Sequence, residues 1–435
     1  MIIDFSISNF RSIREEQTLS FEATGDKHLE SFFVVQMGKY RLLKLITILG
    51  ANASGKSNVL KAFYMLPKLM LHPCQDKTSV ISYARFALDE ACSHQSSKLS
   101  VNFIVEDRKY AYHVEFDNTL VYNELLRCQP FVSTKEHTVY SRTTDVDTLL
   151  STISWGDKYR SADNSRLLMP NLLHNRTLFG AYLHSNVDMP WMKAIIQWLR
   201  AYFMPMVATQ NQGIKAYVSH QLVDKLIDKQ ELVRQLAVAD FGVCELEVEQ
   251  KKQSLDPQVL DLMIHDDNLP RELRQKLVDD PTGIVIDVRM SHQGHQGKVF
   301  FDYGQESAGT QRYYELSGLL VKVIREPHFL AIDELECRLH PDLYMHFINT
   351  YVRNSTHSQI IFSSHSREFL ADRDTYRDDT VYLTEKSEMG DTMLYSLADF
   401  DTKTLRGASS RYNAYRAGRL GGIPTLGDTY MPDSL

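Results

Sequence analysis

The stretch Leu45–Lys61, LITILGANASGKSNVLK, constrains this chain more than any other part of the sequence. Its apolar start has the β-branched content and the length of a buried strand, and the pattern breaks at Gly50. Gly50, Gly55, Lys56 and Ser57 complete the spacing G-x-x-x-x-G-K-[ST], and a helical pattern continues to about residue 71. A strand, a glycine loop and a helix in this order are the setting of a phosphate loop.

The residue types explain how such a loop binds a triphosphate. Glycines let the backbone N–H groups turn toward the β-phosphate, and the helix N-terminus adds a partial positive charge. We therefore expect Lys56 to reach the β- and γ-phosphates and the Ser57 hydroxyl to bind Mg²⁺. The other nucleotide contacts are expected from Gly50, Asn52, Ala53, Ser54, Gly55 and Asn58. The alternative is an ordinary glycine- and serine-containing turn between a strand and a helix.

Composition narrows the class of protein. The 435 residues, 43% hydrophobic and 24% charged, are typical of a soluble globular protein with two or three folding units. The formal net charge of −7 argues against a globally basic nucleic-acid surface. We see neither a run of eighteen apolar residues nor a secretory signal, so no membrane association is expected. Five scattered cysteines without a C-x-x-C pair favour reduced thiols and a cytoplasmic location.

Periodicity predicts an α/β protein whose core is assembled from both ends of the chain. Residues 2–8 and 32–36 read as short strands, and 98–142 as an antiparallel sheet. Residues 165–280 read as helical, with 250–280 as a solvated pair of short helices or a partner-binding arm. From residue 283 strands and helices alternate, which predicts a parallel sheet with helical crossovers.

These patterns divide the chain into five expected segments. An N-terminal part of the core with the phosphate loop is followed by an inserted antiparallel β subdomain and a helical insertion or arm. The C-terminal part of the core and a helical tail come next. The expected boundaries are 1–72, 73–150, 151–282, 283–400 and 401–435.

Phe329–Glu334, FLAIDE, is an apolar strand that ends in two carboxylates. Strand ends in open α/β sheets meet in one crevice, so both carboxylates are expected near the phosphate loop. Asp333 then holds Mg²⁺ opposite Ser57, and Glu334 polarises the attacking water as general base. The alternative is a strand that simply enters a charged turn.

Two further motifs follow strand or helix boundaries. His365 ends the next strand, in Ser363-Ser364-His365, and is expected to sense the γ-phosphate; the alternative is a capping or surface histidine. Glu306–Arg312, ESAGTQR, opens a helix with small residues. Ser307 and the backbone at Gly309 are candidate anion donors there, and the alternative for Ser307 is an ordinary N-cap.

GANASGKS, ESAGTQ, FLAIDE and SSH occur in an order that resembles ABC-type ATPases. The N-terminal SNFRSI resembles the SMC and RecF branch of that family, and AYRAGRLGGIP (414–424) is a weaker echo. The whole chain is similar to stand-alone bacterial ATPases of this branch that occur in abortive-infection and anti-phage systems. Residues 150–280 carry little of the resemblance.

The resemblance implies an ABC-ATPase core that uses ATP and Mg²⁺. In that family the signature serine and glycine act in trans, so Ser307 and Gly309 would cover ATP held by a second subunit. ATP would then close a head-to-tail dimer, in a homodimer or a higher homo-oligomer. Arg11 matches the family's N-terminal arginine, although on its own it reads as a surface charge.

The sequence also departs from the family pattern. Ala308 and Thr310 replace a usual glycine and glutamine, and Glu336 stands for the usual aspartate after the catalytic glutamate. The magnesium-binding glutamine of the lid loop stays open among Gln75, Gln210 and Gln212.

The main hypothesis is an ATPase switch that controls an effector protein, nuclease-like by analogy, in phage defence. A DNA-binding repair ATPase of the RecF kind is the first alternative; its basic cluster would be Lys403, Arg406, Arg411, Arg416 and Arg419. A scaffold that binds ATP and hardly hydrolyses it is the second.

Overall fold

The computed structural model describes residues 1–208, 213–254, 256–264, 271–400 and 410–424. By their contacts these residues form two units, and the chain passes between them four times. Unit 1 contains 1–209, 323–337 and 348–435, and unit 2 contains 210–322 and 338–347. The five segments expected from the sequence remain a finer proposal.

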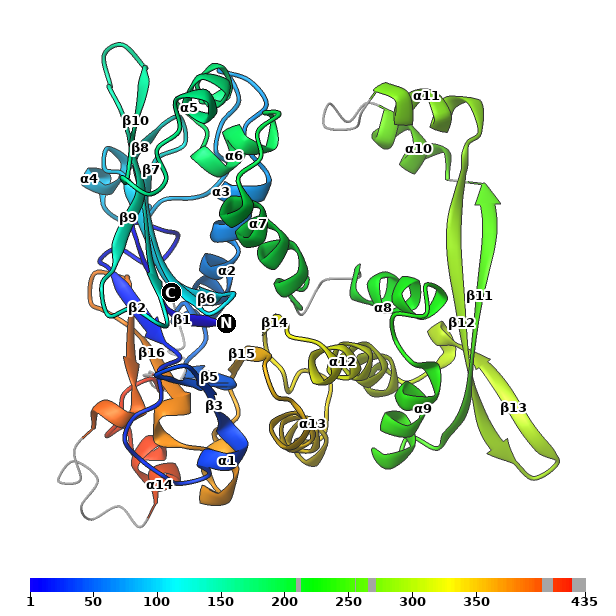
Figure 1. Ribbon diagram of the computed structural model, residues 1–435. Helices are drawn as coiled ribbons and strands as arrows, with labels where there is room; N and C mark the ends of the chain where they lie inside the picture. Colours follow the sequence, from blue (N-terminus) through cyan, green and yellow to red (C-terminus); the bar gives the residue numbers. More distant parts are fainter. Residues whose placement is uncertain (209–212, 255, 265–270, 401–409, 425–435) are drawn as a thin grey trace, which may run out of the picture. The chain divides into compact units, whose positions relative to one another are not determined.

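Unit 1 contains a five-stranded sheet that carries the phosphate-loop strand at its centre (Figure 1). Four strands are parallel and the last is antiparallel to its neighbour. In spatial order the strands are β14 (Phe329–Ile332), β15 (Gln359–Ser364), β5 (Leu45–Gly50), β16 (Val381–Lys386) and β17 (Thr392–Ser396). Strands β14, β15 and β5 are largely apolar and buried along their whole length, as expected when both faces of a parallel sheet are covered.

A seven-stranded antiparallel sheet is the second layer of unit 1. Its strands alternate buried and more exposed residues, as in β7, because one face packs on the core. The order is β10 (Ser151–Trp155), β9 (His137–Thr144), β8 (Val121–Pro130), β7 (Arg108–Phe116), β6 (Ser97–Val105), β1 (Ile2–Ser8) and β2 (Gln17–Ser20). The N-terminal strands β1 and β2 thus belong to the same sheet as β6–β9, which the sequence predicts to form a separate inserted subdomain.

Aromatic rings join the two sheets through the helix that follows the phosphate loop. Phe5 of β1 stacks on Phe63 at a centroid distance of 4.4 Å, and Phe63 stacks on Phe329 of β14 at 5.1 Å. All three side chains are buried. The carboxylate strand and the phosphate-loop helix therefore share one hydrophobic core.

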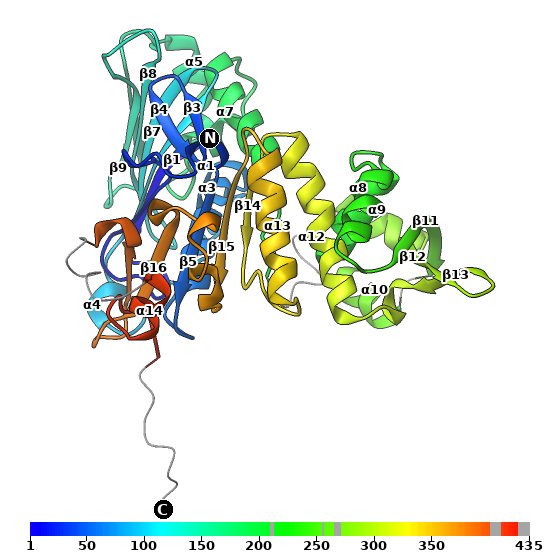
Figure 2. The same cartoon turned by 90° about the horizontal axis from the view of Figure 1, so that it is seen from below.

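Short helices cover the sheets of unit 1 (Figure 2). They are α1 (Glu30–Phe33), α2 (Lys56–Phe63), α3 (Met65–Leu71), α4 (Glu90–Ser93), α5 (Ala162–Leu168), α6 (Leu178–Leu183), α7 (Pro190–Tyr202) and α14 (Arg411–Arg416), with 3₁₀ turns at Met169–Asn171, Arg367–Leu370, Arg373–Thr375, Asp378–Thr380 and Leu397–Asp399. The hairpin β3 (Val34–Met37) and β4 (Tyr40–Leu43) stands apart as a two-stranded sheet.

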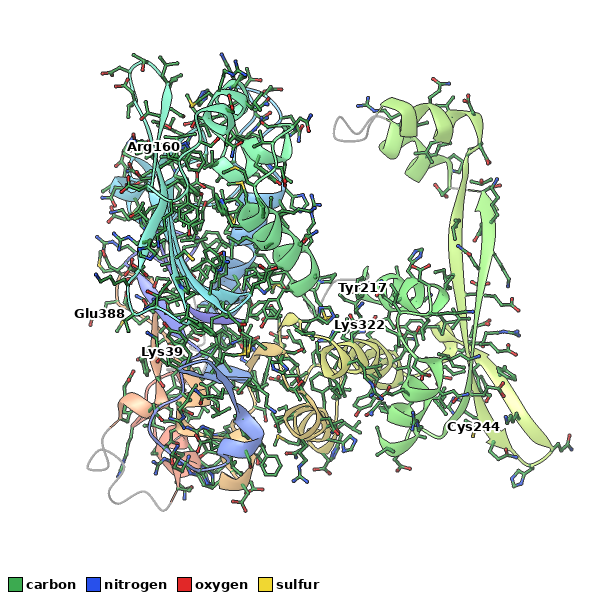
Figure 3. The ribbon with its side chains drawn as sticks, viewed as in Figure 1. Lys39, Arg160, Tyr217, Cys244, Lys322 and Glu388 are labelled. Atoms are coloured by element: carbon green, nitrogen blue, oxygen red, sulfur yellow. The ribbon has the colours of Figure 1, made fainter. Side chains whose placement is uncertain are left out.

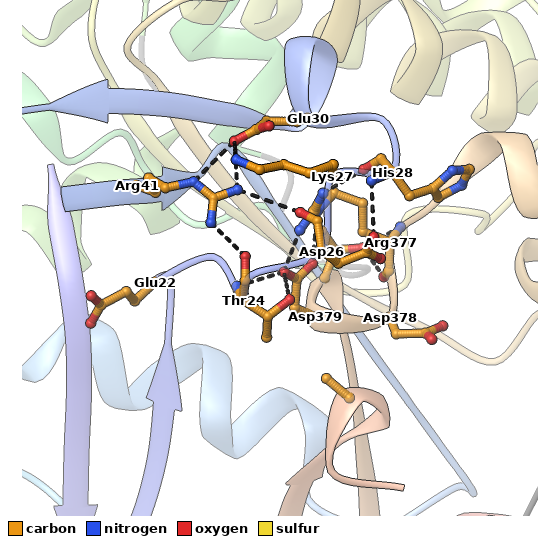
Figure 4. Close-up of polar contacts among 12 residues, drawn as sticks. Glu22, Thr24, Asp26, Lys27, His28, Glu30, Arg41, Arg377, Asp378 and Asp379 are labelled. Atoms are coloured by element: carbon orange, nitrogen blue, oxygen red, sulfur yellow. Dashed lines mark hydrogen bonds and ion pairs between the residues drawn. The ribbon is translucent and has the colours of Figure 1, made fainter. Parts of the chain in front are cut away.

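A polar cluster fastens the N-terminal region to the C-terminal part of unit 1 (Figure 4). The Asp379 carboxylate accepts hydrogen bonds from the backbone N–H and the hydroxyl of Thr24, at 2.9 and 2.8 Å. Arg377 is fully buried, pairs with Asp379 and donates to the carbonyl of His28. This buried guanidinium is thus hydrogen-bonded to partners more than 300 residues apart in sequence.

Unit 2 is built on helices and a three-stranded antiparallel sheet, β11 (Val243–Ser254), β12 (Thr282–Gly294) and β13 (Gly297–Asp302). Its helices are α8 (Gly213–Val223), α9 (Lys229–Val238), α10 (Pro257–Ile264) and α11 (Arg271–Asp279), with a 3₁₀ turn at Tyr303–Gln305. Helices α12 (Ala308–Arg325) and α13 (Pro341–Asn354) begin in unit 2 and end in unit 1. Lys322, labelled in Figure 3, donates to Gln221 Oε1 at 2.7 Å and so ties α12 to α8.

The α/β fold class expected from the sequence is confirmed, and several local predictions are wrong. The strands expected over 283–289 and 298–303 form as β12 and β13, but β12 pairs with β11 and β13 pairs with β12, so neither joins the parallel sheet. Residues 243–254, expected to be helical, are a strand. The first part of 32–36 belongs to α1. The helix expected over 57–71 breaks at Tyr64, because Pro67 lacks an N–H and its ring crowds the preceding turn.

No helix among the described residues has the length and apolar character needed to cross a bilayer.

Candidate active site

The phosphate loop joins β5 to α2 and depends on its glycines for space as well as conformation. Gly55 has φ +104°, and a Cβ there would lie 1.9 Å from Thr392 Oγ1. A Cβ at Gly50 would lie 2.3 Å from Thr384 Oγ1. Both glycines therefore let neighbouring strands approach the loop. The loop leads directly into the N-terminus of the eight-residue helix α2, where free N–H groups favour an anion.

Lys56 is folded back onto the loop. Its Nζ donates to the carbonyls of Gly50 and Ala51, both at 2.8 Å, and lies 3.1 Å from His365 Nδ1. The residue is 5% exposed. Burial lowers the pKa of Lys56 to about 8, while the nearby carboxylates Asp333, Glu334 and Glu336 oppose this shift. The ammonium is thus held at the loop by groups that a phosphate could replace.

The structure brings Ser57 and Asp333 into direct contact. Ser57 Oγ donates to Asp333 Oδ1 at 2.9 Å, across 276 positions of sequence. Ser363 Oγ, at the end of β15, donates to the same oxygen at 2.6 Å and accepts the N–H of Glu334 at 2.8 Å. From the sequence, Ser363 is expected only as part of the end of a strand. That strand lies next to the carboxylate strand, and this position is the signal that would have revealed the contact of Ser363 with Asp333.

The oxygens of Ser57 and Asp333 fit a magnesium ion that is also bound by phosphate. Mg²⁺ prefers oxygen ligands and is usually held by one or two protein groups together with phosphates and water. Within the part of the chain that the structure describes, no group of three or more His, Cys, Asp or Glu side chains could hold a metal by itself. A site completed by a nucleotide is therefore the kind that these residues can form.

Glu334 and His365 form a pair at the ends of β14 and β15. His365 Nε2 lies 3.0 Å from Glu334 Oε1, so the imidazole lies between Glu334 and Lys56. Glu334 has φ +50°, a strained conformation for a residue with a Cβ. Glu336 Oε1 accepts the backbone N–H of His365 at 2.5 Å and so fixes the turn after β15.

Small polar side chains surround the outer side of the loop. Ser12 Oγ lies 2.7 Å from Thr392 Oγ1 and accepts a hydrogen bond from Asn58 Nδ2 at 2.8 Å. Ser54 Oγ lies 2.6 Å from Thr384 Oγ1. The side chains of Asn52 and Ala53 are exposed at the tip, where Ala53 has φ +61°. Ser12, Thr384 and Thr392 carried no sequence signal, because each contact depends on strand placement.

Arg11 lies next to this network without a resolved role. Its backbone has φ +53° and donates to the carbonyl of Ala84 at 2.9 Å. The exposed guanidinium lies 5.7 Å from the ring centroid of Phe10. A phosphate contact by Arg11 stays a prediction.

Ser307 and Gly309 belong to unit 2, whereas the phosphate loop belongs to unit 1. Ser307 Oγ accepts the N–H of Thr310 at 3.1 Å, which is the geometry of an N-cap for α12. A Cβ at Gly309 would lie 3.2 Å from the carbonyl of Arg338. Action on a second subunit's nucleotide stays a prediction for both residues.

Of the three candidates for the magnesium-binding glutamine of the lid loop, the structure describes Gln75. Gln75 is exposed and its amide donates to the carbonyl of Pro73 at 3.2 Å. Gln210 and Gln212 lie outside the described residues.

In the basic cluster, Lys403 and Arg406 also lie outside the described residues. Arg411 forms an ion pair with Asp378 at 2.8 Å, which supports an internal role for that charge.

Comparison with known proteins gives one family match and several similar structures. Residues 223–372, less than half of the chain, match the family model described as "AAA domain, putative AbiEii toxin, Type IV TA system". The matched stretch contains Asp333, Glu334 and His365 but not the phosphate loop. It supports an AAA-type ATPase domain for that part of the chain. No curated protein matches the chain.

The solved structures that resemble the chain include three SMC head domains. An SMC head bound to the C-winged helix domain of ScpA is 12% identical to this chain, with a TM-score of 0.40. The similarity covers 91% of this chain and 97% of the SMC head chain. The SMC head domain from Thermotoga maritima is 11% identical, with a TM-score of 0.37 and coverages of 91% and 98%. An SMC head with an extended coiled coil, bound to the C-terminal domain of ScpA derived from Pyrococcus furiosus, is 12% identical, with a TM-score of 0.36 and coverages of 91% and 96%.

Proposed function

We propose that this protein is an ATPase that hydrolyses ATP with Mg²⁺. The observation that carries the proposal is the 2.9 Å contact between Ser57 of the phosphate loop and Asp333 of the carboxylate strand. A phosphate loop alone occurs in many nucleotide-binding proteins. Its contact with the end of an acidic strand, two positions away in a parallel sheet with β15 between, supports metal-assisted phosphoryl transfer to water.

Each residue then has a defined task. Lys56 binds the β- and γ-phosphates through its ammonium, and Ser57 and Asp333 hold Mg²⁺, which offsets charge on the phosphate oxygens. Glu334 accepts the proton of the attacking water. His365, hydrogen-bonded to Glu334 and to Lys56, orients the carboxylate and contacts the γ-phosphate.

The test uses one variant for binding and one for chemistry. Lys56→Ala is expected to abolish ATP binding, measured by calorimetry. Glu334→Gln is expected to keep ATP binding and to lower turnover by about 10²–10⁴-fold, the usual contribution of a general base. Glu16→Gln, at an exposed carboxylate, is the control. Unchanged turnover in Glu334→Gln would remove Glu334 from the mechanism.

We further propose that ATP closes a homodimer in which Ser307 and Gly309 of one subunit cover the nucleotide of the other. Light scattering of Glu334→Gln should then show an ATP-dependent dimer, and Ser307→Ala should lose it. Ser161→Ala is the matched control, because Ser161 caps α5 in the same way that Ser307 caps α12. A dimer that persists in Ser307→Ala refutes the role in trans.

The proposed biological role is control of an effector protein in anti-phage defence, as in systems of the PARIS kind. Support comes from the family resemblance and from the partial match to a model named for a toxin of the AbiEii type. The test is turnover with and without the product of the adjacent reading frame. An unchanged rate and no complex between the two proteins would count against effector control.

A further inference from the structure

The segment that follows α14 forms a loop beside the phosphate loop that the proposed mechanism does not use. We call Gly418–Gly422 the C-terminal glycine loop. Gly418, Gly421 and Gly422 have φ values of +74°, +67° and +67°, which residues with a Cβ rarely adopt. The backbone turns sharply through N–H bonds from Gly418 to Tyr415, at 2.9 Å, and from Gly421 to Gly418, at 3.2 Å. This segment was only a weak echo in the sequence.

Two tyrosines hold the loop against the end of the five-stranded sheet. Tyr395 of β17 donates its hydroxyl hydrogen to the carbonyl of Leu420 at 3.0 Å, and Tyr415 of α14 donates to the carbonyl of Gly422 at 2.9 Å. Leu420 is 1% exposed. A Cβ at Gly421 would lie 2.2 Å from Tyr395 Oη. The loop is therefore packed in a defined place.

That place adjoins the first residue of the phosphate loop. A Cβ at Gly422 would lie 3.7 Å from Gly50 Cα and 3.5 Å from the carbonyl of Thr384. Thr384 of β16 is the residue that pairs with Gly50. Gly422 thus lies within van der Waals range of Gly50 and of the Thr384 carbonyl, so the phosphate loop is bordered by backbone on this side.

The strand order tells which end of a bound nucleotide would meet this border. Asp333, Glu334 and His365 follow β14 and β15, on one side of β5, and β16 and β17 lie on the other side. The γ-phosphate must face the carboxylates and His365. The α-phosphate and the nucleoside then point toward β16 and β17, where Thr392 and Ser12 contact each other and lie close against Gly55 of the loop.

We propose that the C-terminal glycine loop forms the nucleoside side of the ATP site and contacts the base or ribose through its backbone. This inference rests on the proposed ATPase function. Backbone N–H and carbonyl groups between glycines can approach a ligand closely and hydrogen-bond the edge of a base. The loop thus makes the site prefer a nucleotide over a bare triphosphate.

The first test compares ATP with inorganic tripolyphosphate, which has the phosphates and no nucleoside. Gly421→Ala is expected to weaken ATP binding at least about tenfold and to leave tripolyphosphate binding unchanged. Gly297→Ala is the matched control, because Gly297 has φ +122° and nothing within 4 Å of an added Cβ. Unchanged ATP binding in Gly421→Ala overturns the proposal. Equal weakening for both ligands also overturns it, because the loop would then act only on the phosphate loop.

The second test uses the unaltered protein, so it holds even if Gly421→Ala does not fold. An ATP analogue with a photoreactive azide on adenine is bound, irradiated and mapped by mass spectrometry. Label within residues 418–424 is expected, and label confined to other segments overturns the proposal. If the unaltered protein binds neither ATP nor tripolyphosphate, the proposed ATPase function itself is refuted.

Discussion

The buried ammonium of Lys56 makes ATP binding depend on pH in a way that the structure quantifies. Burial lowers the pKa of Lys56 to about 8, so about half of the molecules carry a neutral amine at that pH. A triphosphate favours the charged form and raises this pKa in the complex. Binding must therefore take up protons, by about 0.5 per site at pH 8 and about 0.9 at pH 9.

The same titration sets the apparent affinity. At pH values below the pKa of Lys56 in the nucleotide-free protein, Lys56 is charged and ATP binding is at its strongest. At pH values above this pKa, the amine must be protonated for ATP to bind. The dissociation constant should rise about tenfold from pH 7 to pH 9, which is about 1.4 kcal/mol. The γ-phosphate of ATP contributes little over this range, because its second pKa is about 6.

Calorimetry in two buffers of different ionisation enthalpy measures the proton uptake directly. Lys56→Arg is the matched control, because a guanidinium stays charged and any residual binding should be independent of pH. Lys44, whose pKa is also lowered to about 8, hydrogen-bonds carbonyls at Val352 and Ser355 and remains unchanged in this control. Proton uptake that persists in Lys56→Arg, or affinity that is constant from pH 7 to pH 9, refutes the reasoning.

Three further predictions test the site and its support. Asp333→Asn should raise the Mg²⁺ concentration needed for half-maximal turnover at least about tenfold, while ATP binding without metal stays the same; equal metal dependence would place Mg²⁺ elsewhere. Gly55→Ala should abolish ATP binding, since a Cβ there meets Thr392 Oγ1 at 1.9 Å, whereas Gly25→Ala, with nothing within 4 Å, should bind normally. Glu124→Leu should lower the free energy of unfolding, measured with urea, by about 3–5 kcal/mol. The reason is that the buried Glu124 carboxylate accepts hydrogen bonds from the hydroxyls of Tyr112 and Tyr140 and from the N–H of Leu178. A loss below about 1 kcal/mol would contradict this prediction.

The arrangement of the candidate site followed from sequence because short motifs and sheet topology determine it. The phosphate loop needs only local residues, and the rule that ligands bind at the carboxyl ends of parallel strands brought Asp333 and His365 to it. What the motifs could not give were contacts between turn residues and side chains on strands far away in the sequence. Ser12 with Thr392 and Ser54 with Thr384 are examples, since each joins residues more than 300 positions apart.

The failure at residues 243–254, which form a strand and not a helix, has a different cause. Their glutamates, lysines and glutamines have good helix propensity, and few apolar residues mark a strand. In the structure the charges pair across strands, as between Lys251 and Asp287 at 2.8 Å and between Lys298 and Glu245 at 2.8 Å. Such cross-strand pairs stabilise a sheet only in one register, which a single sequence does not reveal. The same limitation hid the joining of β1 to β6.

The central position of β5 has a consequence for how the protein is made. Its neighbours on both sides, β15 and β16, begin at residues 359 and 381, whereas β5 ends at residue 50. A ribosome adding about 5–20 residues each second needs on the order of 15–60 s to cover that interval. During this time a largely apolar segment has no sheet to enter, so the nascent chain is a natural client for chaperones. It cannot bind nucleotide until most of its length has emerged.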